Sequence, residues 1–126
     1  MKLATTISIV VFATFLLAIS GCGKKADENK PISEVKTEAA KMNVEQLRQM
    51  ATSYKTALAS RQAQVDKLVT KLKEIPVTQM LGEQSKKLKG DIDNLTKSTS
   101  ALQERFGIYY NALKEKGGNL AGLEVK

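Results

Sequence analysis

The chain lacks most of the side chains on which catalysis and metal binding depend. Its 126 residues contain no histidine and no tryptophan, and they contain a single cysteine, Cys22. Histidine is the side chain that most often serves as a general base and as a metal ligand near neutral pH. A lone cysteine cannot form a disulfide within the chain, so cysteine spacing says nothing about the fold.

The familiar catalytic and ligand-binding motifs are also missing from the sequence. Asp91-Ile92-Asp93, followed by Asn94, resembles a calcium loop only faintly, because the glycine and the distal glutamate of such loops are absent at the required spacing. Ser98-Thr99-Ser100 has no histidine to act as its base. We therefore expect no enzymatic activity, no metal site and no cofactor.

The first 22 residues have the order of charges and hydrophobic residues found in secretory signals. Met1-Lys2 is a short cationic start, Leu3 to Ile19 is mainly apolar, and Ile19-Ser20-Gly21-Cys22 ends the stretch. This sequence of charge, apolar core and small residues is typical of a cleaved signal peptide. The alternative is an uncleaved signal anchor, but residues 3–21 are barely long enough to span a bilayer.

Ile19-Ser20-Gly21-Cys22 resembles the lipobox of bacterial lipoproteins. The resemblance implies that the Cys22 thiol is alkylated by diacylglycerol, that cleavage falls between Gly21 and Cys22, and that further acylation, such as with palmitate, completes the anchor. Several acyl chains give stable membrane attachment, whereas one is marginal. Gly23 stands where aspartate would favour inner-membrane retention, so the resemblance implies the periplasmic face of the outer membrane.

The excess of positive charge is spread along the chain. Lysine and arginine number 20 against 13 acidic residues, a formal net charge of +7. No segment concentrates this excess, and we expect no nucleic-acid partner for an exported protein. Anionic lipid headgroups or cell-wall polymers remain open as partners, but dispersed charge is weak evidence for either.

The chain after the lipobox divides into a tether, a helical region and a tail. Residues 22–42 are interpreted as the lipidated cysteine and a flexible tether, with a faint helical pattern over 32–42. Residues 43–117 are the main helical region, and residues 118–126 form a C-terminal tail that we expect to fold back on it.

Two heptad patterns predict two long helices in residues 43–117. Asn43 with Gln46 has capping-box spacing, Pro76 ends the first pattern, and Gly117-Gly118 ends the second. The first set of heptad positions is Val44, Leu47, Ala51, Tyr54, Leu58, Arg61, Val65, Leu68, Leu72 and Ile75. The second set is Ser85, Leu88, Ile92, Leu95, Thr99, Leu102, Phe106, Tyr109 and Leu113. We therefore predict an all-α fold, an antiparallel two-helix coiled-coil hairpin with helices at about 44–75 and 85–116.

Two helix registers satisfy this pattern, one with Arg61 opposite Ile92 and one with Arg61 opposite Thr99. We favour the second, because it places the two polar heptad residues in one layer and brings the aromatic residues Tyr54, Phe106 and Tyr109 together. The Arg61–Thr99 layer is interpreted as setting the register, with a notch for a partner carboxylate as the alternative. A lone hairpin buries too little to be stable, so we expect self-association or packing by residues 32–42 and 119–126.

These features predict a structural or adaptor lipoprotein that binds an envelope protein or a second copy of itself. The alternative is a lipoprotein that binds cell wall or anionic glycolipid. The plan of the chain is similar to that of murein lipoproteins, in which a C-terminal lysine joins peptidoglycan, and Lys126 matches this feature. Pro76, the glycine stop and the lack of a basic-aromatic run before Lys126 depart from that family.

Overall fold

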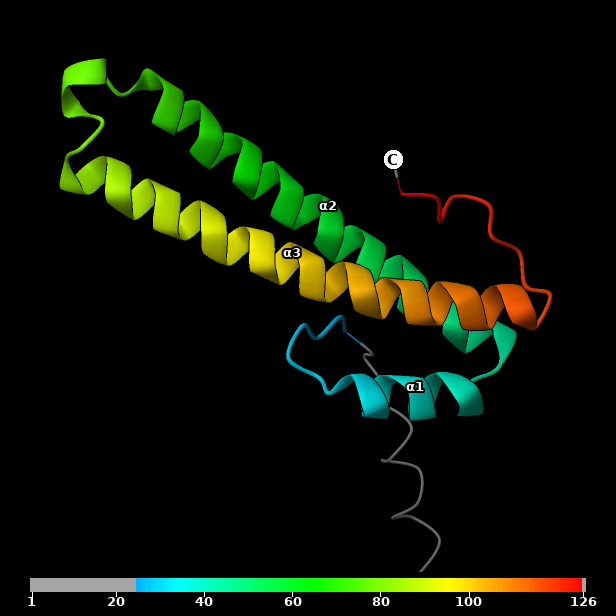
Figure 1. The fold of residues 1–126 in the computed structure, drawn as a ribbon. Coiled ribbons are helices and arrows are strands. Elements are labelled where there is room, and N and C mark those ends of the chain that lie inside the picture. The colour runs from blue at the N-terminus through cyan, green and yellow to red at the C-terminus, as the bar shows by residue number, and fades with distance from the viewer. Residues whose placement is uncertain (1–24, 126) are drawn as a thin grey trace, which may run out of the picture.

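A computed structural model describes residues 25–125 as a helical hairpin with two flanking segments. The elements are α1 (Ile32–Lys41), α2 (Val44–Glu74), the short 3₁₀ helix η2 (Val77–Gln79) and α3 (Glu83–Glu115). Helices α2 and α3 run antiparallel and side by side, and η2 lies in the turn that joins them (Figure 1). The predicted all-α hairpin is confirmed. The proposed signal peptide, Cys22 and Lys126 lie outside the described residues.

Local sequence signals set the ends of the two long helices. The Asn43 side chain accepts a hydrogen bond of 2.8 Å from the Gln46 amide, and the Gln46 side chain accepts one of 3.1 Å from the Asn43 amide. This is the predicted capping box. At the far end of α2, Ile75 is extended before Pro76, as expected for a residue that precedes proline.

The end of α3 is a Schellman motif built on the two glycines. Gly117 has a φ of +72°, and its amide donates to the Lys114 carbonyl at 3.0 Å. The Gly118 amide donates to the Leu113 carbonyl at 2.9 Å. These two bonds satisfy carbonyl groups that would otherwise end the helix unpaired.

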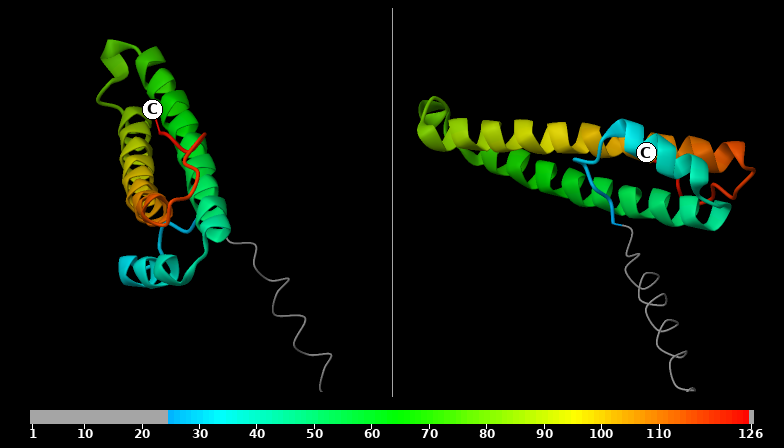
Figure 2. Two further views of the ribbon diagram at one scale, coloured as in Figure 1. Left: turned by 90° about the vertical axis from the view of Figure 1, so that its right-hand side faces the viewer. Right: turned by 90° about the horizontal axis from the view of Figure 1, so that it is seen from below.

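The core lies in the half of the hairpin remote from the turn, which we call the base. There α1 and the C-terminal tail pack on opposite sides of the α2–α3 pair (Figures 1 and 2). Helix α1 contributes Val35 and Ala39, and the tail contributes Leu123. The hairpin itself contributes Leu47, Met50, Ala51, Tyr54, Leu58, Leu102, Phe106, Tyr109 and Leu113. The predicted packing of both flanks on the hairpin is confirmed.

The other half of the hairpin is only partly covered. Neither α1 nor the C-terminal tail reaches it, so only the two long helices pack together there (Figure 1). We call six of these half-buried side chains the distal seam: Val65, Leu68, Leu72, Leu88, Ile92 and Leu95. The same heptad pattern therefore builds a closed core at the base and an open apolar surface nearer the turn.

Candidate interaction surfaces

Residues 25–31, which we call the N-terminal strap, lie against the hairpin instead of forming the expected flexible tether. The Tyr54 hydroxyl donates to the Asp27 carbonyl at 3.0 Å and accepts from the Asp27 amide at 3.1 Å. A backbone with both its donor and its acceptor held by one side chain is fixed in place. The tether interpretation therefore fails for the strap, whereas α1 follows the faint helical pattern noted over 32–42.

Arg105 holds the next part of the strap. Its side chain is only 8% exposed, and its guanidinium donates to the Lys30 carbonyl at 2.9 and 2.6 Å and to the Ala101 carbonyl at 2.8 Å. Lys30 in turn forms an ion pair of 2.5 Å with Glu38 of α1. The strap and α1 are thus joined to α3 by a buried cation that donates to backbone carbonyls.

Arg61 lies beside Ser98, the chain neighbour of Thr99, and its guanidinium turns out of the helix interface. The Arg61 guanidinium donates to the Ser98 hydroxyl at 3.0 Å and lies 3.8 Å from the Glu28 carboxylate of the strap. The Ser98 hydroxyl donates to the same carboxylate, whereas the Thr99 hydroxyl donates to the Leu95 carbonyl of its own helix at 2.8 Å. Arg61 reaches out of the interface toward the strap, because there it meets a carboxylate and water.

This arrangement bears on the alternative that Arg61 lies in a notch for a partner carboxylate. A carboxylate does sit beside Arg61, but it belongs to Glu28 of the same chain. The Arg61 side chain is about one-third exposed, and so is that of Glu28. An ion pair this accessible is worth little on its own, so Arg61 serves mainly to position the strap.

The aromatic residues form the centre of the base. The rings of Tyr54 and Tyr109 are stacked with centroids 5.4 Å apart, and Phe106 lies 5.6 Å from Tyr110. Burial raises the pKa of Tyr109 far above the usual value of a phenol, and the neighbouring Tyr54 and Glu38 add to the effect. The Tyr109 hydroxyl donates to Glu38 at 3.3 Å. These rings act as core, and they are covered by α1 and the strap.

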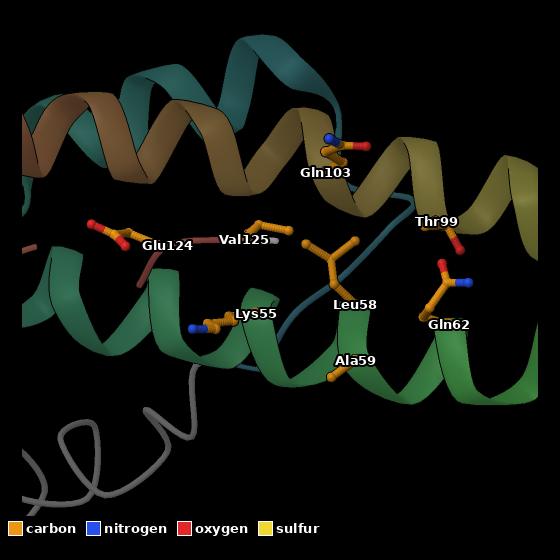
Figure 3. A pocket seen from close by; sticks show the side chains of 8 residues that line it. All are labelled: Lys55, Leu58, Ala59, Gln62, Thr99, Gln103, Glu124 and Val125. Carbon is orange, nitrogen blue, oxygen red and sulfur yellow. The ribbon is translucent and has the colours of Figure 1, made fainter. Parts of the chain in front are cut away.

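A groove of about 430 Å³ lies beside the C-terminal tail. Leu58 and Val125 supply its apolar surface, and Gln62, Thr99 and Gln103 point toward it from the two helices (Figure 3). The tail reaches this place because Arg48 donates to the carbonyls of Asn119 and Ala121, and Lys55 donates to that of Gly122. Lys55 and Glu124 also line the groove, so it combines amides and a hydroxyl with two charged side chains of opposite sign.

The turn of the hairpin contains large apolar side chains that are exposed to solvent. Val77 is 89% exposed and Leu81 is 87% exposed. Both lie beyond the last turn of α2, at the end of the molecule farthest from α1 and the tail (Figure 1). We call residues 76–82 the tip.

The strap contacts and the tip were missed by reading the sequence. Arg105 stands beside the heptad residue Phe106, and nothing in its spacing distinguishes it from a solvated arginine. The tip had a usable signal: Val77, Met80 and Leu81 place three apolar residues in a segment that follows a helix-ending proline. Loops in that position are usually polar.

Across residues 25–125, no helix is long and apolar enough to cross a membrane, and no group of acidic side chains could hold a metal ion. No protein-family model, curated protein or solved structure matches this chain. The function must therefore be inferred from the surfaces just described.

Proposed function

We propose that this chain is a lipid-anchored lipoprotein of the bacterial envelope whose hairpin binds another protein. The lipobox-like sequence Ile19-Ser20-Gly21-Cys22 supports the anchor. The partner is a second envelope protein or a second copy of the chain, and the role is that of an adaptor or structural element.

The observation that carries the binding role is the contrast between the base and the distal seam. The base is closed by α1 and the tail, and its heptad residues from Leu47 to Leu58 and from Leu102 to Leu113 are buried. The distal seam continues the same heptad pattern, but residues such as Leu68, Leu72 and Ile92 stay partly exposed. A helix pair with an uncovered apolar stripe offers the surface on which a further helix packs.

The strap sets how the hairpin would sit on its anchor. Three residue steps separate Cys22 from Lys25, and an extended chain covers about 10 Å in that distance. Since Asp27 and Glu28 already contact α2 and α3, little free chain is left between a lipid on Cys22 and the hairpin. The proposal therefore places the hairpin close to the membrane surface, where tethering raises its effective concentration for other membrane-bound partners.

The anchor is tested by Cys22→Ala in cells. We expect the precursor to accumulate, because the leader cannot be removed at an unmodified site, and we expect labelled palmitate to be lost. Fractionation and intact-mass measurement read both effects. Ser20→Thr, which keeps the thiol, is the control. A Cys22→Ala protein that is cut and anchored as the wild type would refute the lipoprotein assignment.

A further inference from the structure

The tip carries large apolar side chains that are almost fully exposed to solvent. Val77 and Leu81 are almost fully exposed, and Pro76 beside them is exposed as well. Both α1 and the tail pack at the other end of the hairpin (Figures 1 and 2), so neither covers the tip. Exposed large apolar residues grouped at one place commonly mark a binding surface.

Lysines surround this apolar group. The tip and the adjoining helix turns, residues 71–89, contain five lysines and two glutamates. Each of the five lysines is solvent-exposed, and each lies within about 10 Å of the tip along its helix at 1.5 Å per residue. They are Lys71, Lys73, Lys86, Lys87 and Lys89. The local excess of positive charge therefore coincides with the exposed apolar side chains.

We propose that the tip docks on an anionic phospholipid bilayer, with Val77 and Leu81 inserted among the headgroups and the lysines on the lipid phosphates. Apolar side chains flanked by lysines are the composition of interfacial membrane contacts. The docking is an activity of the tip itself and does not depend on lipidation of Cys22.

The shape and composition of the tip favour a bilayer over a protein partner. The tip is a narrow projecting end of the hairpin (Figure 2), and residues 71–89 contain no aromatic residue and no arginine. Protein hot spots are enriched in aromatic residues and arginine that fill pockets. Lysine acts as a hydrated point charge without bidentate geometry, which suits a fluid array of phosphates.

A second copy of the chain is a poorer occupant of the tip. Two tips that met end to end would bring two sets of five lysines together, and like charges at close range repel. An anionic surface removes this repulsion and adds attraction. The positive charge around Val77 and Leu81 therefore favours an anionic bilayer over a second copy of the chain.

The absence of tryptophan from the chain allows a local test of the docking. In Leu81→Trp, the tip carries the only tryptophan of the full-length protein. The full-length protein is added to vesicles of phosphatidylcholine alone or of phosphatidylcholine with an equal part of phosphatidylglycerol. We expect the tryptophan emission to shift to shorter wavelength, and brominated lipids to quench it, only in the phosphatidylglycerol vesicles.

Two variants make the result specific to the tip. Val125→Trp puts the probe at another exposed valine, in the C-terminal tail that packs on the base, and its emission should be the same in both vesicles. Lys86→Gln with Lys87→Gln, added to Leu81→Trp, should remove much of the shift, and so should high salt. Far-UV circular dichroism checks that the helices are intact.

Three outcomes would overturn the proposal. One is a tip tryptophan that stays in water on phosphatidylglycerol vesicles, and another is an equal shift at position 125. The third is a shift that survives the lysine substitutions and high salt, because the contact would then not be electrostatic. A tip that stays in water on vesicles but crosslinks to an envelope protein in cells would identify a protein partner instead. Processing at Cys22 is read separately, so failure of the anchor and failure of the tip are distinguished.

Discussion

At the scale of single residues, Arg105 shows how one buried cation organises a segment distant in the sequence. It contacts the Lys30 carbonyl 75 positions away and fixes the strap on α3. Hydrogen bonds from a charged donor contribute more than neutral ones, and removing the donor leaves buried carbonyls without a partner.

Arg105→Met is therefore expected to lower the free energy of unfolding by about 1–3 kcal/mol. Urea denaturation followed by circular dichroism measures the change. Arg48→Met is the matched control, because Arg48 also donates to distant carbonyls but from an exposed position. The control should cost less than about 1 kcal/mol. Equal losses in the two variants would show that burial of Arg105 is unimportant.

At Ser85, by contrast, we expect a substitution that does not lower the stability. Its side chain is fully buried, and its hydroxyl has no hydrogen-bond partner. A buried hydroxyl without a partner costs free energy that an apolar side chain of similar size does not incur. Ser85→Ala should leave stability unchanged or raise it by about 1 kcal/mol, measured by urea denaturation. Ser100→Ala, at an exposed site of the same helix, should change little, and a clear loss for Ser85→Ala would contradict the packing.

Tyr109 makes a prediction about alkaline pH. The folded protein raises the pKa of this phenol, whereas in the unfolded chain it stays near 10. Above pH 10 the unfolded state releases this proton and the folded state keeps it, so stability falls as pH rises. The fall attributable to one such group approaches about 1.4 kcal/mol per pH unit.

Tyr109→Phe should remove this contribution. We expect the variant to lose stability less steeply than the wild type between about pH 10 and 11, measured by thermal unfolding at a series of pH values. Every other ionisable group is present in both proteins. Tyr110→Phe is the control, because Tyr110 is only half-buried. An unchanged slope in Tyr109→Phe would refute the role given to this phenol.

At the scale of elements, Gly118 after α3 and Gly90 within α3 differ in how much space surrounds them. A Cβ added to Gly118 would lie 2.1 Å from Leu113 Cδ1 and 3.0 Å from Val44 Cγ1. The glycine thus lets the end of α3 close against the start of α2. A Cβ added to Gly90, within α3, meets nothing within 4 Å.

Gly118→Ala is expected to cost about 1–3 kcal/mol, because the methyl group must displace buried Leu113. Gly90→Ala is expected to stabilise the protein by about 1 kcal/mol, since alanine is the better helix former. Thermal denaturation of the two variants beside the wild type measures both effects. A neutral Gly118→Ala would mean that the chain end is not seated on Leu113 as the structure has it.

The elements were largely predictable because their signals are local. Asn43 with Gln46, Pro76, and Gly117-Gly118 mark helix ends through contacts within a few residues, and the heptad pattern joins the two helices. The strap was not predictable in this way. Its position depends on contacts that Glu28 and Lys30 make with residues 70 or more positions away. Neither residue belongs to a periodic pattern that would indicate these contacts. The partners of Arg61 were unpredictable for the same reason, since Glu28 belongs to the strap.

At the scale of the whole molecule, the hairpin has two ends with different properties. The base is a three-layer structure in which α1 and the tail cover the long helices (Figure 2). The distal half is a bare helix pair, with the distal seam on its sides and the tip at its end. This polarity explains how a chain with a modest core can still present a partly exposed apolar surface: the buried residues lie mainly in the base, and the distal half is covered less.

The central claim is that the distal seam binds a protein partner in the cell. The most direct measurement is photo-crosslinking in intact cells from an unnatural amino acid at position 72 in the distal seam, with position 49 on an exposed site of the base as control. The proposal predicts a protein adduct of discrete mass from position 72 that is absent from position 49 and weakened by Cys22→Ala. No adduct at position 72, or the same adducts from both positions, would contradict it.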